Sequence, residues 1–514
     1  MSDEGRFYEF PPQAPDAVLL GLGPLQAGVL LGTAVVAVGG VLVGVPVLPL
    51  MVFAGVGAAL AWGRVAGDAV VEWLAVWLVS LWRRVRGQHR WMAEVPWWGI
   101  QVGGEGDAPL EARPVELPPC LRGVELSEAV AEELTSPGFG VVRDTRAGTA
   151  SVLLRVSGVE FALLEPAEQD SVVGRWGDIL SSLCTERNPV VQVSWTATSA
   201  PSGLAEHRAW LARERDASPV VGEAAADAVA SYELLVAEMG TATVEYEVTV
   251  AVTVSAGAVT LRRRPGLADP QVRLLQVLER AATGVAGDLS AAGLSVDGPL
   301  DPGDVAEVLR SRVDPEGVRV RRQGRLLGDR LGPVQAASAG PLVLRESFGS
   351  LEIDGTHQAV YVVSEWPRSA RRADWFGDVL DWPGTVDRTV TVLHVPEGLS
   401  RSLKRIERQL TGLAADEAVA ADRGKRVNAF HRRAEAAAQQ REEELVSGHG
   451  QMKVVGLCVI SASKDDELID GCDLFERQCR TLGMDVRRLW GRQAAGWAAA
   501  TGIGVRIGDR GAML

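Results

Sequence analysis

A long apolar stretch, from Ala27 to Trp62, contains no charged residue and constrains the fold more than any other feature. As one helix it would be about 54 Å long, at ~1.5 Å per residue. The hydrocarbon core of a bilayer is only ~30 Å thick. Three residues interrupt the middle of the stretch: Gly44, Pro46 and Pro49. Because proline ends helices, we expect a membrane hairpin of two spans, at about residues 25–43 and 47–62.

Small residues would let the two helices of this hairpin pack closely. They are Gly32, Gly39 and Gly40 in the first helix, and Gly55, Gly57, Ala58 and Ala59 in the second. A buried helical hairpin of a globular protein is the alternative, but soluble helices nearly always carry a polar face. A cleaved signal peptide is disfavoured, because no basic region precedes the stretch and the apolar run is too long.

The segment that follows, residues 63–95, predicts an amphipathic helix in the membrane interface. Apolar residues recur there at helical spacing, and tryptophan and arginine favour the headgroup layer. The candidate interface residues are Arg64, Trp73, Trp77, Trp82, Arg83, Arg84 and Arg86. A third span over residues 69–82 is the alternative. That run is short for a span and would place Glu72 inside the bilayer.

The charges that flank the hairpin predict its orientation. Arginines gather after the second span, and the positive-inside rule places that side in the cytoplasm. A hairpin returns the chain to the side it left, so both termini and the soluble part are expected there. Five scattered cysteines suit a reducing compartment. We therefore expect a bacterial cytoplasmic membrane protein, whereas a third span would move the soluble part outside.

Composition narrows the class of partner. The formal net charge is -14, which disfavours direct nucleic-acid binding because that needs an extended basic surface. The basic residues are almost all arginine, and alanine, glycine and valine are abundant. This bias suggests a GC-rich bacterial genome.

The rest of the chain alternates strand-like and helix-like segments without a fixed-period repeat. We expect a cytoplasmic tail over residues 1–24, a first α+β domain over 96–340 and a second over 341–514, with mostly antiparallel sheets. Residues 399–448 predict a long helical pair. Asp301 is a candidate N-cap, and Asp354-Gly355 a candidate hairpin turn.

Motifs that carry chemistry are missing from the sequence. It has no GxxxxGK[ST] phosphate cradle, no GxSxG elbow, no HExxH and no CxxC pair, and its six histidines are isolated. The sequence therefore predicts no enzyme, no catalytic residue, no cofactor and no metal site.

Three weaker signals have simpler explanations than binding. The glycines of residues 502–511 fit a C-terminal loop better than a phosphate site, because no helix follows them. Two basic runs, residues 262–264 and 319–325, fit solvated faces better than contacts with anionic lipid or nucleic acid. The acidic run at residues 465–473 fits the start of a helix, where the helix dipole favours carboxylates.

The order of these segments resembles a known family. Residues 441–504, from "REEELVSGHG" through "RRLWGRQAAGWAAATGIG", resemble the stretch before the ATPase core of conjugation and type IV secretion motors, the CagE/TrbE/VirB component family. Residues 152–183 and the strand "VVQVSWTA" are similar to that family's opening domain. The hairpin and "GRVAGDAVVEWLAVWL" resemble a PrgI/VirB-type membrane subunit. The whole arrangement resembles an actinobacterial membrane-protein family found beside conjugation-type ATPases.

The resemblance implies a membrane platform and not a motor, because the Walker lysine has no counterpart here. On that basis we expect a non-catalytic scaffold that docks a separate secretion or conjugation ATPase, contacts other membrane-complex subunits and forms a homo-oligomer. Two alternatives remain open. They are a membrane subunit of a type VII secretion core complex, and a membrane-anchored enzyme with an unrecognised site.

Overall fold

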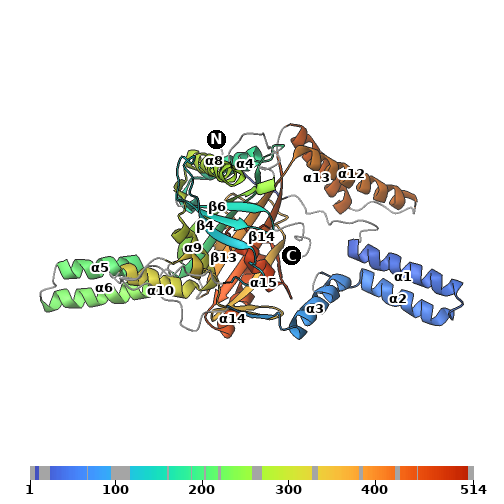
Figure 1. Ribbon diagram of the computed structural model, residues 1–514, viewed down its shortest axis with the longest axis horizontal. Coiled ribbons are helices and arrows are strands. Elements are labelled where there is room, and N and C mark those ends of the chain that lie inside the picture. The colour runs from blue at the N-terminus through green and yellow to red at the C-terminus, as the bar shows by residue number, and fades with distance from the viewer. Residues whose placement is uncertain are drawn as a thin grey trace.

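The computed structural model describes residues 6–10, 24–65, 68–93, 116–158, 161–186, 188–201, 204–217, 222–242, 244–257, 269–326, 334–380, 386–422, 429–447 and 450–506. At its centre is a 13-stranded sheet, in which the pairings between the described strands are antiparallel. Helices cover both faces of the sheet, and three helical hairpins project from it (Figure 1). The expected α+β class with an antiparallel sheet is confirmed.

The sheet has one continuous strand order. From edge to edge it runs β3 (Arg90–Met92), β10 (Val343–Glu346), β11 (Leu351–Ile353), β12 (Thr356–Glu365), β14 (Gln451–Ala462), β13 (Asp387–Glu397), β7 (Val190–Pro201), β8 (Val244–Ser255), β6 (Thr149–Ser157), β5 (Gly140–Asp144) and β4 (Val124–Glu128). In addition, β9 (Ser295–Pro299) pairs with β6 and β15 (Asp485–Arg488) pairs with β12. The central strands are rich in valine and threonine, whose branched side chains suit a pleated surface.

Two runs of elements repeat one topology. The first is β6, α4 (Pro166–Ser182), β7, β8, α8 (Pro270–Ala291) and β9. The second is β12, α11 (Gly377–Leu380), β13, β14, α14 (Asp465–Thr481) and β15. Numbered within each run, the strands lie in the order 4-1-3-2. This is the split βαβ arrangement called ferredoxin-like. We call the two runs the first and second repeats.

Each repeat carries a helical hairpin between its second and third strands. These hairpins are α5 (Ala205–Ala217) with α6 (Glu223–Ala242), and α12 (Leu399–Asp422) with α13 (Ala429–Val446). The predicted helical pair is α12 and α13. Equivalent backbone bonds support the match of the repeats: Leu300 N donates to Leu153 O, and Leu489 N to Val360 O, both at 2.9 Å. The spacing between such equivalent residues is not constant, so the duplication leaves no fixed period in the sequence.

Three apolar cores hold the layers together. On one face of the sheet, α8 packs Leu278 and Leu289 against the first repeat, and α14 packs Phe475 against the second. On the other face, α9 (Pro302–Val313) and α15 (Gln493–Ala500) share one core, in which Trp497 is almost fully buried. This third core spans both repeats and joins them.

The predicted domain boundary at residue 340 falls between the repeats, and the strands of both predicted domains belong to one sheet. Just before the boundary lies the helix α10 (Pro315–Leu326). The remaining short elements are η1 (Phe161–Leu163), η2 (Ala336–Ser338), β1 (Arg64–Val65) and β2 (Asp68–Ala69). Asp301 caps α9 as expected, because its side chain accepts from Asp304 N. Asp354 and Gly355 form the expected turn between β11 and β12, both with positive φ.

Candidate membrane-anchoring site

The apolar stretch forms two helices that lie side by side, α1 (Pro24–Leu42) and α2 (Val47–Trp62) (Figure 1). Their ends agree with the predicted ends to within about one residue. Gly44 takes a φ of 82°, which favours glycine, and Pro46 is the N-cap of α2. Pro49 lies in the first turn of α2, where a backbone N–H has no intrahelical partner to lose.

Two of the predicted small residues make the close contact between α1 and α2. A Cβ added at Gly57 would lie 2.4 Å from Thr33 Cγ2, and one at Gly40 would lie 2.5 Å from Leu50 Cδ2. At the open end of the hairpin, Gln26 Nε2 donates to Ala61 O at 2.7 Å. The other predicted glycines face open space and play no part in the contact: Gly32, Gly39 and Gly55.

The outward faces of the hairpin are apolar and exposed. Within α1, residues Leu25–Leu42 have a mean hydropathy of 2.0, and only 11% of this window is buried. Among the described residues, α1 is the helix long and apolar enough to cross a membrane. The apolar helix α2 has 16 residues, about 24 Å. Because the apolar side chains of α1 and α2 are so exposed, the two helices do not fit the alternative of a hairpin buried in a globular core.

The next helix, α3 (Val70–Val85), packs one side against the soluble part. The rings of Trp73 and Phe348 meet edge to face, with centroids 6.2 Å apart. A Cβ added at Gly491 would lie 2.9 Å from Val76 Cγ1 and 3.4 Å from Ser80 Cβ. Because α3 touches the loop before α15 so closely, it is positioned by the sheet domain.

An ion pair strengthens this contact: Arg83 Nη1 lies 3.8 Å from Glu346 Oε2. Glu346 also accepts from Ala494 N at 3.0 Å, at the start of α15. Burial raises the pKa of Glu346, against the opposing effects of the Ala494 N–H and of Arg83. Two predicted interface residues, Trp73 and Arg83, thus contact the soluble part.

The opposite side of α3 carries a continuous apolar stripe. Its members follow i, i+3, i+4, i+7, i+8 and i+11 spacing and are exposed: Leu74, Trp77, Leu78, Leu81, Trp82 and Val85. The Arg86 guanidinium lies 4.0 Å from the centre of the Trp82 ring. Arg84 is exposed, and the side chain of Arg64 lies outside the described residues. The stripe suits an interfacial helix. If α3 were a third span, Trp73, Val76 and Arg83 would have to leave their contacts with the sheet domain.

The short segment before the hairpin, residues 6–10, attaches to the soluble part. Tyr8 and Arg371 exchange two backbone hydrogen bonds, of 2.8 and 2.9 Å. Arg6 N donates to Asp170 Oδ2 at 2.7 Å, and the Tyr8 hydroxyl to Asp170 Oδ1 at 3.0 Å. Burial, followed by Asp170, raises the pKa of Tyr8.

The ring of Phe10 completes this attachment. It stacks on Trp366 with centroids 5.8 Å apart and meets the edge of Trp375 at 5.3 Å. Sequence reasoning missed this contact, although the aromatic residues in "FYEF" stand out in a polar tail. After the hairpin, β3 pairs with β10 at the sheet edge. The segments before and after the α1–α2 hairpin are therefore fastened to the same body.

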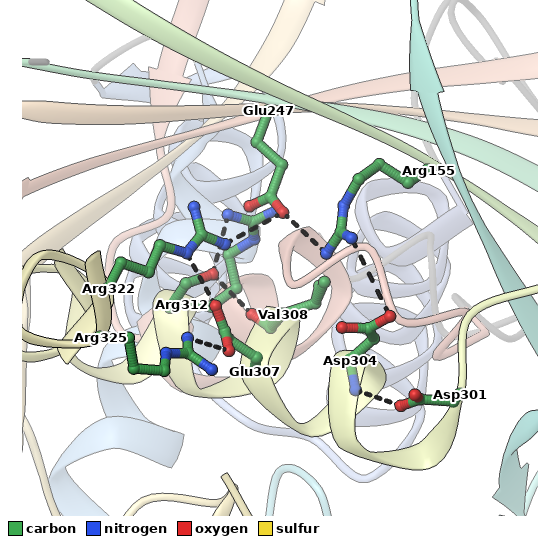
Figure 2. Close-up of polar contacts among 10 residues, drawn as sticks. Arg155, Glu247, Asp301, Asp304, Glu307, Val308, Arg312, Arg322 and Arg325 are labelled. Atoms are coloured by element: carbon green, nitrogen blue, oxygen red, sulfur yellow. Dashed lines mark hydrogen bonds and ion pairs between the residues drawn. The ribbon is translucent and has the colours of Figure 1, made fainter. Parts of the chain in front are cut away.

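A second polar cluster lies between the sheet and helices α9 and α10, as Figure 2 shows. Glu307 accepts from Arg322 Nε and Arg325 Nη2, both at 2.7 Å. Glu247 accepts from Arg322 at 3.3 Å and from Arg155 at 3.4 Å. Burial raises the pKa of Glu307, but the bonds and charges of the two α10 arginines outweigh it, so its pKa is lowered.

The basic run at residues 319–325 thus has a structural role. Arg319 Nη1 also lies 2.5 Å from Asp387 Oδ1, so the prediction of a simply solvated face is wrong for the three paired arginines. Arg319 and Arg322 hold α10 against the sheet, and Arg322 and Arg325 hold it against α9. The other basic run, residues 262–264, lies outside the described residues.

The glycines near the C-terminus cross the middle of the sheet. A Cβ added at Gly502 would lie 2.1 Å from Thr196 Oγ1, and Ser151 Oγ donates to Gly504 O at 3.2 Å. Their backbone packs on sheet hydroxyls, which agrees with the expected loop; residues 507–514 lie outside the described part. The acidic run starts α14 as expected, with Asp465, Asp466 and Glu467 in the first turn.

A recess and two histidines in the described part of the chain are confined or already have a partner. A recess between α9, α15 and the sheet, lined by Arg312, Gln358 and Trp497, has a volume of about 10 Å³, the room of one water molecule. His394 is buried, and burial lowers its pKa to about 4. His207 instead shares a hydrogen bond with Tyr232 on the α5–α6 hairpin.

One group among the described residues has the spacing for a metal ion. Glu417 on α12 and His431 and Glu435 on α13 hold ligand atoms within 4.8 Å of one another. They offer three ligands, whereas closed structural zinc sites use four. The five cysteines are free thiols, and burial raises the pKa of Cys458 to about 12, which disfavours the thiolate that binds metals.

Comparison with protein-family models and with curated proteins gives no match to this sequence. The features that the structure brings together are the apolar hairpin, the α3 stripe and the docked N-terminal segment. Together they form a module suited to holding a large folded body at a lipid surface.

Proposed function

We propose that this protein is a non-catalytic scaffold in a bacterial cytoplasmic membrane. In this proposal α1 and α2 both span the bilayer, and both termini and the sheet domain lie in the cytoplasm. The scaffold belongs to a conjugation or type IV-like secretion apparatus, docks a separate ATPase and assembles with other membrane subunits and with copies of itself. The observation that carries the proposal is that residues 6–10, before the hairpin, bind the same sheet domain that the chain enters after the hairpin.

The attachment bears on the number of spans. With a single span, Tyr8 and Arg371 would lie on opposite sides of a hydrocarbon core ~30 Å thick, and their two backbone bonds could not form. With two spans both residues lie in one compartment. The short α2 is about 6 Å less than that thickness, a mismatch that local thinning accommodates at fractions of a kcal/mol per Å.

The α3 helix supports the same arrangement. One side of it rests on Phe348 and Gly491, so its exposed stripe faces away from the sheet domain. Trp77 and Trp82 are amphipathic residues of the kind that collect at headgroup depth. Lipid contact along this stripe would seat the sheet domain directly on the cytoplasmic leaflet.

The non-catalytic part of the proposal rests on packing. The recess at the centre of the sheet has room for about one water molecule, whereas small-molecule sites are usually ~300–1,000 Å³. The carboxylates and arginines between α9 and α10 bind one another. The assignment to a conjugation-type system rests on the sequence resemblance of residues 441–504 to the segment that precedes the motor ATPase core.

Topology can be tested in living cells. We expect green fluorescent protein to fluoresce when fused to either terminus, because both are cytoplasmic. We expect Val45→Cys, in the α1–α2 connection, to react with a membrane-impermeant maleimide added outside. A dark fusion at one terminus, or protection of the cysteine at position 45, would contradict the two-span arrangement.

The scaffold role needs a separate test. The membrane complex should co-purify with an ATPase encoded by a neighbouring gene, and deletion of this protein should abolish transfer without changing hydrolysis by the isolated ATPase. Loss of export of small helical proteins, with DNA transfer intact, would favour a type VII system. Nucleotide hydrolysis by this chain alone would overturn the non-catalytic assignment.

A further inference from the structure

The α12–α13 hairpin of the second repeat consists of two helices that lie side by side (Figure 1). On α12, Ile406, Leu410 and Leu413 recur at i, i+4 and i+7, the spacing with which one side of a helix faces a partner helix. Ile406 is buried and the two leucines are half-buried. On α13, Ala438 and Leu445 are both buried. The spacing and burial of these residues indicate an apolar seam between the two helices.

Towards the tip of the hairpin, polar residues take over the same positions. Glu417 comes four residues after Leu413 and therefore continues the row of α12. On α13, His431 and Glu435 come seven and three residues before Ala438 and share its side of the helix. His431 and Glu435 are half-buried, and Glu417 is exposed. The side of a helix that faces a partner is usually apolar, so these polar residues need a reason to be there.

The hairpin brings the three polar side chains into one group. Each offers one ligand atom, and these atoms lie within 4.8 Å of one another. In the sequence only His431 and Glu435 are close, and the turn of the hairpin adds Glu417 from the other helix. Two carboxylates at this separation repel each other, and neither takes part in an ion pair with a described residue. A cation bound between the carboxylates would remove that repulsion.

We propose that Glu417, His431 and Glu435 bind one divalent transition-metal ion, with water completing its coordination. The imidazole favours zinc, iron, nickel or copper over magnesium and calcium, which prefer oxygen ligands. Three protein ligands and a water molecule are a known coordination of zinc. An imidazole can bind a metal through one ring nitrogen while the other holds a neighbouring group. Facing helices of bundles hold metal ions in this manner.

A metal ion at this place would clip the hairpin near its tip. The ligands come from both helices, so separation of α12 from α13 would require loss of a metal–ligand bond. An ion that binds only the closed hairpin stabilises it, and local opening of the two helices becomes rarer. The site does not depend on the number of membrane spans, because its three ligands belong to one hairpin of the sheet domain.

Calorimetry on the full-length chain in detergent tests the site. The protein carries no histidine tag and is stripped with EDTA before titration with Zn²⁺. We expect one Zn²⁺ per chain, and a Kd roughly tenfold weaker or more after Glu417→Gln, His431→Gln or Glu435→Gln. His207→Gln is the matched control, since it removes a histidine of the equivalent α5–α6 hairpin. Glu443→Gln removes an exposed glutamate further along α13, and both controls should keep the Kd of the unaltered chain.

Hydrogen exchange tests the clip. With Zn²⁺ bound, the amides around residues 413–417 and 431–435 should exchange several-fold more slowly, because opening of the hairpin becomes rarer. The amides of α5 and α6 should exchange at the same rate with and without Zn²⁺. In His431→Gln, the slowing around both ranges should be absent.

Co²⁺ in place of Zn²⁺ reports the ligands in the unaltered chain, so this measurement does not need any variant to fold. We expect weak visible absorption bands of nitrogen and oxygen coordination and no thiolate-to-cobalt band in the near ultraviolet. A thiolate band would place the metal on cysteines and overturn the inference. Failure of the unaltered chain to bind Zn²⁺, an equal Kd in all the variants, or a zinc-bound hairpin that exchanges as fast as the metal-free one would overturn it as well.

Discussion

Thr196 and Thr391 face each other across the middle of the sheet, with their Oγ1 atoms 3.0 Å apart. They are equivalent residues of the two repeats. In the second repeat, Val459 on β14 pairs with Val360 on β12 and with Thr389 on β13. In the first repeat, Ala251 on β8 pairs in the same way with Leu153 on β6 and with Ser194 on β7. Thr391 is two residues after Thr389, and Thr196 is two residues after Ser194; the two threonines pair with each other. An approximate two-fold axis therefore passes between them, perpendicular to the sheet.

The hydroxyl of Thr391 should matter for stability, because it also donates to Ala500 O at 2.8 Å. Thr391→Val would leave that carbonyl and the Thr196 hydroxyl without a partner in a buried place. We expect a loss of about 1–3 kcal/mol in the free energy of unfolding, measured by thermal denaturation in detergent. Thr198→Val is the control, since its hydroxyl makes a longer, 3.4 Å contact. Equal effects of the two changes would contradict the argument.

The ion pairs of α10 predict a pH dependence. The pKa of Glu307 is lower in the folded protein than its ordinary value of 4.5. Its contribution to the free energy of unfolding is therefore fully present above pH 4.5. It is lost as the pH falls through the lower pKa of the folded protein. Glu307→Gln should cost about 1–2 kcal/mol near pH 7 and progressively less at about pH 4 and below.

The control for that experiment is Glu352→Gln, which removes an exposed pair with Arg345. Exposed pairs contribute only ~0–1 kcal/mol, so this variant should match the unaltered chain at both pH values. A Glu307→Gln effect that stays constant, or grows, as the pH falls would show that the carboxylate charge does not stabilise the contact.

Local patterns account for what could be predicted from the sequence. The unbroken apolar run predicted α1 and α2, and the caps and turn at Asp301 and Asp354 follow from short-range chemistry. Contacts between distant segments were out of reach. In the sequence, nothing distinguishes Asp170 from other surface acids, and only the fold places it beside Tyr8. The sequence likewise predicts that the three α10 arginines are solvated, because it does not show that Glu307 and Asp387 lie beside them.

The duplication was hidden for a related reason. The topology repeats, but the side chains differ: Thr391 and Thr196 are identical, whereas Val360 corresponds to Leu153 and Thr389 to Ser194. A sheet needs only the right polarity on each face, so many residue pairs serve equally well. Strand pairing therefore shows the repeat and sequence spacing does not.

Release of the N-terminal segment should be measurable. Phe10→Ala removes the ring that lies against Trp366 and Trp375, so residues 6–10 should open more often. We expect their amide hydrogens to exchange roughly tenfold faster. Phe7→Ala is the matched control, since Phe7 is an exposed aromatic of the same segment. Unchanged exchange in Phe10→Ala would show that the hydrogen bonds of Tyr8 suffice without the ring.

The two sides of α3 should differ in their surroundings. Spin labels at Leu78 and Ser80, introduced through cysteine substitutions in the full chain in liposomes, report contact with lipid-soluble oxygen and with a water-soluble nickel chelate. Leu78 belongs to the exposed stripe, so we expect high oxygen and low nickel accessibility. Ser80 lies against Gly491 and should be protected from both reagents. Burial raises the pKa of the native thiols Cys120, Cys184 and Cys458, which slows their labelling, and the unaltered chain measures what remains. High nickel accessibility at Leu78 would place α3 in water and remove the membrane-surface contact from the proposal.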